Sequence, residues 1–223
     1  AQAHFGRPVQ PVLYDDGSLD ADFVVPTGGF SSTVLTLAPQ PDGQLLVGGS
    51  FITYGTGTAN SIARLTSTGA LDTTFNSGGA GFTANSRVNA IATTLAPVAA
   101  NQKHVIGGSF TTINGTTRNR MARLDNSGAS DSTFAFGNPG FNAEVTAVAT
   151  QSDGKIIGAG YAQQVNGQGG NRALLARLTS NGSAVDDLTV PSVIPGLVYN
   201  TNVVRHTPNG GLIVGATRVD LSL

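Results

Sequence analysis

The chain has 223 residues, of which 39% are hydrophobic and 11% are charged, and its formal net charge is −1. This length allows one or two domains with a sizeable core. A net charge near zero argues against nucleic acid and anionic membranes as partners. The absence of cysteine excludes disulfides and thiolate metal sites, and no apolar run is long enough to span a membrane.

The 30 glycines, together with many Thr, Ser and Asn residues, are typical of turn-rich β structure. The chain begins AQAHFG, a small-residue sequence of the kind found near a signal-peptidase cut. We therefore expect a mature secreted protein, with an artificial start point as the alternative.

The first complete set of strands is predicted between residues 33 and 75. Strands at 33–40 (TVLTLAPQ) and 44–51 (QLLVGGSF) flank a Pro-Asp-Gly turn, which predicts an antiparallel hairpin. A glycine-rich link at 53–60 leads to a third strand at 61–66 (SIARLT). A turn then leads to the sequence LDTTF at 71–75.

This set recurs along the chain with a period of roughly 51 to 59 residues, and three markers keep their order. The first marker is a glycine, at Gly48, Gly107, Gly158 and Gly215. The second is the Arg-Leu pair that begins at Arg64, Arg123 and Arg177. The third is a phenylalanine after an aspartate, at Phe23, Phe75 and Phe134, with VDDL at 185–188 as a degenerate fourth copy.

Three or four short antiparallel strands per unit, at this period, predict an all-β protein of the β-propeller class with about four blades. Under this interpretation Gly48 and its equivalents allow neighbouring inner strands to approach closely, while a plain β-bulge is the alternative. The phenylalanines are predicted to be wedges between blades. The arginines are predicted to be structural, packing on a neighbouring blade and pairing with a turn aspartate, with an anion pocket as the alternative.

The stretch from PDGQLLVGGSF through IARL to LDTTFN resembles the delta-60 repeat, a β-propeller repeat of bacterial secreted and surface proteins. The resemblance covers nearly the whole chain, and the third copy departs from it at Ala159 and Tyr161. It implies a fold and a secreted or cell-surface location, and it does not imply an activity.

The two ends of the chain are complementary, because 9–23 corresponds to the third and fourth strands of a blade and 203–219 to the first and second. We expect residues 1–223 to form a single propeller domain in which these ends complete one blade. A piece of a larger propeller is the alternative.

No catalytic constellation emerges from the sequence. Glu144 is the sole glutamate, most aspartates lie in recurring turns, and His4, His104 and His206 lack metal-ligand spacing, so they are expected to be exposed singletons. We expect no cofactor. The one candidate calcium site is the acidic cluster Asp15, Asp16, Asp20 and Asp22, which matches no known calcium loop.

These observations favour a non-enzymatic secreted or cell-surface module for adhesion or assembly, with other proteins or copies of itself as partners. The alternative is a glycan-binding propeller. The chain has no tryptophan and only four tyrosines, and Tyr54 and Tyr161 do not occupy matching repeat positions, which weakens a repeated sugar site.

Overall fold

The computed structural model describes residues 20–76, 81–82, 85–94, 101–136, 139–161, 164–165, 168–169, 175–183, 185–186, 198–206 and 212–219. Every regular element in these ranges is a β-strand, and all the strand pairs are antiparallel. The predicted all-β class is confirmed. Among the same residues, no helix has the length and apolarity needed to cross a membrane.

Three successive sheets, here called units 1 to 3, repeat one strand order. Unit 1 has the order β1 (Val34–Pro39), β2 (Leu45–Gly49), β5 (Ile62–Leu65). Unit 2 has the order β6 (Val88–Thr93), β7 (His104–Gly108), β10 (Met121–Leu124). Unit 3 has the order β11 (Val145–Thr150), β12 (Ile156–Gly160), β15 (Leu175–Leu178), β16 (Val185–Asp186). The first strand of every unit carries a register shift near its start.

A C-terminal hairpin follows unit 3 and consists of β17 (Val198–His206) and β18 (Leu212–Val219). It provides the antiparallel pair predicted at 203–219. The predicted complement is 9–23, of which only 20–23 are described, and these form a turn. The completed blade therefore stays a prediction.

The predicted glycine-rich link is in fact a small hairpin, and each unit has one. These hairpins are β3 (Thr53–Tyr54) with β4 (Gly57–Thr58), β8 (Thr112–Ile113) with β9 (Thr116–Thr117), and β13 (Gln164–Val165) with β14 (Gln168–Gly169). Asn114 and Gly115 form the turn of the second hairpin with φ of 49° and 76°. Two positive φ values in a two-residue turn match the twist of the flanking strands, which explains the Asn-Gly sequence.

The fourth strand predicted at LDTTF is reduced to single bridges in two units, Leu65 to Leu71 and Leu124 to Ser130. It ends there because the carboxylate of Asp72 accepts hydrogen bonds from the backbone N–H and the hydroxyl of Thr74, at 2.9 and 2.6 Å. This local turn directs the chain towards the next unit.

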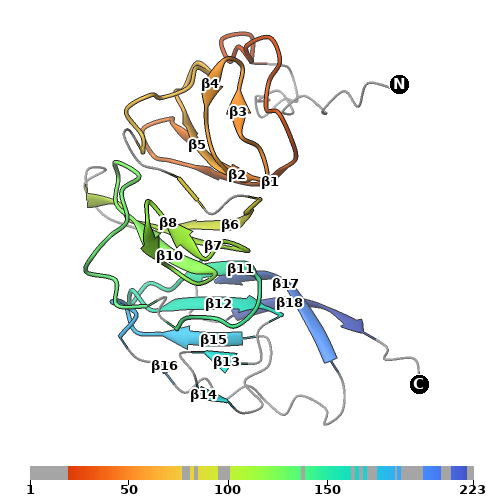
Figure 1. Cartoon of the computed structure of the whole chain (residues 1–223), viewed down its shortest axis with the longest axis vertical. Helices are drawn as coiled ribbons and strands as arrows, with labels where there is room; N and C mark the ends of the chain where they lie inside the picture. The colour runs from red at the N-terminus through yellow and green to blue at the C-terminus, as the bar shows by residue number, and fades with distance from the viewer. Residues whose placement is uncertain are drawn as a thin grey trace.

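The units stack as an open arc, visible in Figure 1. Strand β1 packs beside β6, β6 beside β11, and β11 beside β17, so the first strands of successive units are neighbours. Strands β1 and β17 mark the two ends of this series.

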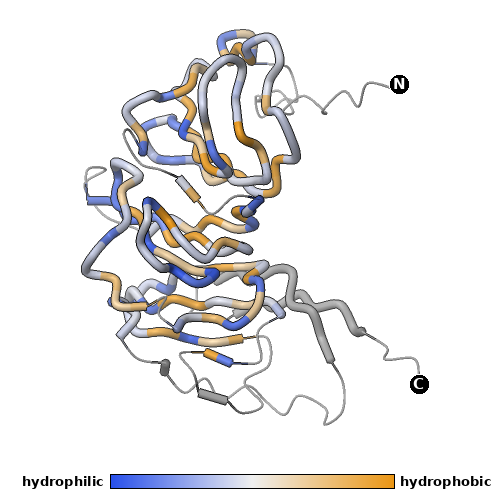
Figure 2. Tube along the Cα trace, in the orientation of Figure 1, coloured by the Kyte–Doolittle hydropathy of each residue, from blue (hydrophilic) through white to orange (hydrophobic). Residues whose placement is uncertain are grey.

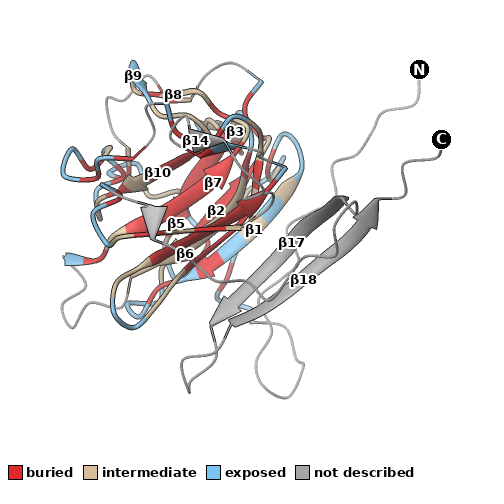
Figure 3. Cartoon of the chain, turned by 90° about the horizontal axis from the view of Figure 1, so that it is seen from below, coloured by how far each residue is buried: buried red, intermediate tan, exposed pale blue. Residues whose placement is uncertain are grey.

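The core lies between the units, because alternate residues of each strand point to opposite faces of the sheet. Leu46 packs with Ile106 between units 1 and 2, and Val105 packs with Ile156 between units 2 and 3. Figure 2 shows hydrophobic residues along these strands, and Figure 3 shows that β2, β5 and β7 are buried whereas β1 carries exposed residues.

Candidate functional site: the joints between units

The repeated arginine bridges one unit to the next. Arg64 on β5 forms an ion pair with Asp72 of its own unit, with 2.7 Å between Nη2 and Oδ2. Its Nη1 also donates to the carbonyl oxygen of Asn126 in unit 2, at 2.5 Å. The side chains of Arg64 and Asp72 are only 7% and 10% exposed, so this bridge is largely shielded from water.

The same bridge recurs between units 2 and 3. Arg123 on β10 donates to Asp131, with 2.8 Å between Nε and Oδ2, and to the carbonyl oxygen of Ser180 in unit 3. Burial alone would raise the pKa of Asp131, but hydrogen bonds from Thr133 and Arg123 and the charge of Arg123 lower it to about 2. The pKa of Asp72 is lowered against the same opposing burial, by Thr74 and Arg64. Both carboxylates therefore stay charged and paired.

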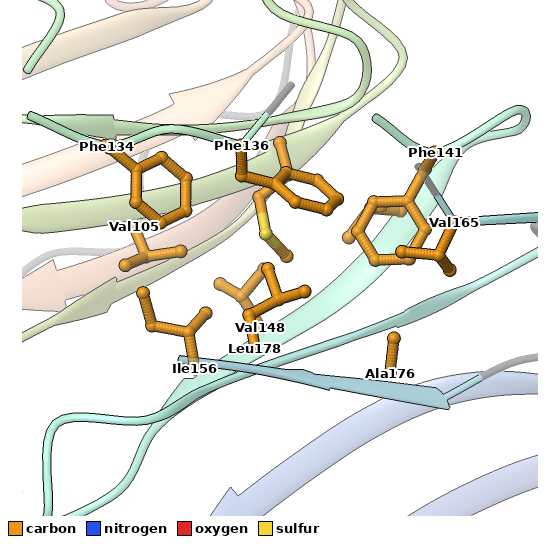
Figure 4. Packing of buried hydrophobic residues seen from close by; sticks show 11 residues of the cluster. Val105, Phe134, Phe136, Phe141, Val148, Ile156, Val165, Ala176 and Leu178 are labelled. Atoms are coloured by element: carbon orange, nitrogen blue, oxygen red, sulfur yellow. The ribbon is translucent and has the colours of Figure 1, made fainter. Parts of the chain in front are cut away.

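Two of the repeated phenylalanines, Phe75 and Phe134, pack between units, whereas Phe23 packs on unit 1 and its role between units stays a prediction. Phe23, Phe75 and Phe134 are 9%, 7% and 1% exposed. The guanidinium carbons of Arg64 and Arg123 lie 4.9 Å from the ring centres of Phe75 and Phe134, so these two rings are also covered by a cation. Figure 4 shows Phe134 and Phe136 across from Val148 and Ile156 of unit 3.

The residue directly after each of the three phenylalanines attaches it to the turn of the following unit. The backbone N–H groups of Val24, Asn76 and Ala135 donate to the carbonyl oxygens of Thr68, Ser127 and Asn181. Each acceptor precedes a glycine, and a Cβ on Gly128 would lie 2.7 Å from the backbone nitrogen of Asn76. Glycine is needed at this turn because the preceding segment approaches so closely.

The first glycine marker has the predicted close-packing role at two of its positions. A Cβ on Gly48 would lie 2.7 Å from Cγ1 of Val88 in unit 2, and one on Gly107 would lie 2.5 Å from Cγ1 of Val145 in unit 3. The β-bulge alternative also holds in part, because the opposite strand β1 shifts register between Val34 and Thr36, beside Gly48.

The strand register corrects the marker at Gly158. Thr36 pairs with Gly48 and Ala90 with Gly107, each directly after the register shift, and in unit 3 the corresponding pair is Ala147 with Ala159. Gly158 is therefore one residue out of register. In the C-terminal hairpin Gly215 pairs with Val203 directly after the shift, as the prediction requires.

His104 is not the exposed singleton expected from the sequence. It is fully buried on β7 between units 1 and 2. Its Nδ1 lies 3.2 Å from the hydroxyl of Thr93, and its Nε2 lies 3.5 Å from the side-chain nitrogen of Gln40. Burial is the largest influence on the pKa of His104, lowering it to about 4, so the imidazole is neutral at pH 7. His4 and His206 are not described at the side-chain level.

The candidate calcium cluster falls partly outside the described residues, which exclude Asp15 and Asp16. The carboxylate of Asp20 accepts from the backbone N–H of Asp22 at 3.0 Å, the same turn that Asp72 makes with Thr74. Among the residues that the structure describes, no three acidic or histidine side chains gather to hold a metal ion. Asp20 and Asp22 thus belong to the repeated turn.

Arg177 also follows the repeat in its backbone pairing, since it lies opposite Asp186 on β16. It takes part in an interaction of its own. Whether it bridges to a further unit stays a prediction, because Leu188 and its neighbours lie outside the described residues.

The tyrosines considered for sugar binding occupy different environments. Tyr54 is 2% exposed and its hydroxyl donates to the carbonyl oxygen of Gly69 at 2.8 Å, so its ring offers no open platform. Tyr161 is 45% exposed. A mainly apolar cavity of about 560 Å³ lies beside Tyr54, lined by residues that include Val24, Pro26 and Leu71.

Sequence reasoning missed one marker of the joints, a Gly-Phe pair seven residues after each wedge. Phe30, Phe82 and Phe141 form bridges to Tyr54, Ile113 and Val165 of the small hairpins. The signal was present in the sequence as the recurring GF at 29–30, 81–82 and 140–141.

Comparison with known proteins gives one match. Residues 40–75, 103–134 and 151–184 match a family model described as "Domain of unknown function (DUF5122) beta-propeller". Each segment begins after the first strand of one unit and covers the second strand, the small hairpin and the third strand of that unit. Neither the curated proteins nor the solved structures compared with the chain gave a match. The antiparallel units and this match identify the chain as an all-β protein of the β-propeller class.

Proposed function

We propose that this chain is a delta-60 repeat propeller of bacterial origin that works without catalysis, as a secreted or cell-surface module for adhesion or assembly. Its partners are other proteins or copies of itself. The joints support this proposal first, because Arg64 and Arg123 bond to the next unit while ion pairs hold them to aspartates of their own units, and Phe75 and Phe134 pack between units.

The observation that carries the proposal is the exposed first strand of unit 1. Leu37 on β1 pairs with Val47, and its register counterparts are Ile91 in unit 2 and Val148 in unit 3. Val148 is 3% exposed and Ile91 packs into the core between units 1 and 2, whereas Leu37 is 48% exposed. Leu37 is thus an apolar residue that is exposed at a position where the other two units bury theirs, as is typical of an interaction surface.

The test is photo-cross-linking in cells that make the protein, with a photoreactive amino acid at position 37 and a control at position 52. Ile52 is 64% exposed, and its counterpart in unit 2 is the polar Thr111, so it is an exposed apolar residue outside the repeated interface. We expect a protein adduct from position 37 and none from position 52. The cross-linked protein should be degraded by protease added outside the cells, as a secreted or cell-surface location requires. Absence of a protein adduct, together with saturable binding on a glycan array, would instead support the lectin alternative.

A further inference from the structure

The two ends of the arc differ in construction. At one end, the face of unit 1 that points away from unit 2 has the same construction as the faces that units 2 and 3 present to their preceding units. Leu37 and Val34 occupy the positions of Ile91 and Val88 in unit 2, and of Val148 and Val145 in unit 3.

The burial of these positions differs because units 2 and 3 are covered and unit 1 is not. Val88 and Val145 are fully buried, and the packing of the preceding unit accounts for this. Val34 is only partly buried and Leu37 is about half exposed. The outer part of the same face is covered by Phe23, Phe30, Phe51 and Tyr54. The inner strand β1 is therefore the open part of the joint.

At the other end, β17 continues the series of inner strands by packing on β11 and β12 of unit 3. In units 1 to 3 the second strand pairs on its far side with a third strand, β5, β10 or β15. The second strand of the C-terminal hairpin, β18, pairs with β17 and has no third strand among the described residues. Among the described residues, this end therefore consists of the first two strands of a unit.

Among the described strands, the two ends of the series pack on different units. Strand β1 packs on β6 while β17 packs on β11 and β12, and the units between them separate the ends, as Figure 1 shows. A contact between two different surfaces of identical copies is head-to-tail, and it closes into a ring or extends as a filament.

From this geometry we infer that the open face of unit 1 receives the C-terminal hairpin β17–β18 of a second copy, in a joint that continues those inside the chain. The inference rests on the proposed function and names its partner. Leu37 is the apolar anchor of this joint.

The first experiment is sedimentation velocity of the purified full chain over a range of concentrations. The test variant is Leu37→Asp and the matched control is Ile52→Asp, which adds the same charge at an exposed apolar position outside the repeated interface. We expect self-association of the wild-type chain and of Ile52→Asp, and a dissociation constant raised at least about 30-fold by Leu37→Asp. A wild-type chain that stays monomeric, or equal loss of association in both variants, would overturn the inference.

The second experiment does not depend on a destabilising change. A photoreactive amino acid at position 37 is activated in an equal mixture of unlabelled and ¹⁵N-labelled chains, and the adduct is mapped by mass spectrometry. Mixed-isotope adducts within 198–219 support the head-to-tail joint. Adducts within 198–219 that contain a single isotope would overturn the inference, because they would show that position 37 contacts the hairpin of its own chain in a closed ring. If the purified chain is monomeric but position 37 captures another protein in cells, the inference falls and the proposed function stands.

Discussion

His104 is expected to make the joint between units 1 and 2 sensitive to acid. The perturbation is a shift from pH 7 to pH 5, applied to the wild-type chain and to His104→Leu. Leucine is the matched replacement because Leu45 and Ile156 occupy the corresponding register positions in units 1 and 3.

The direction in which the free energy of unfolding changes with pH follows from the lowered pKa of the buried imidazole. The folded state keeps His104 neutral down to about pH 4, whereas the unfolded chain takes up the proton near pH 6.5. Below pH 6.5 the unfolded state therefore binds more protons, and the free energy of unfolding falls as the pH is lowered. The charges that act on the imidazole are Arg64, which opposes protonation, and Asp42 and Asp125, which favour it.

The difference between these pKa values corresponds to about 3 kcal/mol of unfolding free energy, of which about 2 kcal/mol is lost by pH 5. The paired aspartates do not contribute in this window, because the pKa values of Asp72 and Asp131 lie below their ordinary 3.8 and their stabilisation is lost only at lower pH.

The assay is urea denaturation at several pH values between 7 and 5, followed by circular dichroism. We expect the free energy of unfolding of the wild-type chain to fall by about 2 kcal/mol, and that of His104→Leu to change much less over the same range. Parallel pH dependence in the two proteins would refute the reasoning, since the proton uptake would then belong to other groups.

Two further predictions concern packing at the joints. Gly107→Ala places a Cβ 2.5 Å from Val145, so it should lower the free energy of unfolding by about 1–3 kcal/mol. The reverse change at the equivalent position, Ala159→Gly, should cost about 1 kcal/mol or less. Equal, small effects of both variants in urea denaturation would argue against the register assignment. Phe134→Ala removes a wedge that is 1% exposed and should cost about 3–5 kcal/mol, while Phe134→Leu, the residue type found at the degenerate fourth copy, should cost less; a neutral Phe134→Ala would show that the wedge does not hold units 2 and 3 together.

The hairpins, the arginines and the wedge phenylalanines were predictable because they recur with the period of the fold. Gly158 was misassigned because GAG at 158–160 matches VGG in two registers, and only the cross-strand pairing with Ala147 and the partner strand decides between them. The burial of His104 could have been predicted, because aligning KHVIGG with QLLVGG places the histidine at the position of an apolar residue in the first repeat.

The particular residues that meet at each joint were not predictable from the sequence. Arg64 reaches Asn126, 62 residues away, and Arg123 reaches Ser180, 57 residues away. These contacts depend on how one sheet stacks on the next, and a strand pattern fixes the faces of a sheet without fixing its neighbour.

The central claim is that the repeated arginine, held by the aspartate of its own unit, joins one unit to the next. The most direct test is a double-mutant cycle on Arg64 and Asp72. The free energies of unfolding of Arg64→Met, Asp72→Asn and the double variant are compared with that of the wild-type chain. Because the pair is shielded and Arg64 also holds the turn of unit 2, we expect Arg64→Met to cost about 3 kcal/mol, with a coupling energy of at least about 1 kcal/mol. A neutral Arg64→Met with no coupling, accompanied by lost binding of inorganic phosphate, would contradict the account and assign the arginines to an anion site.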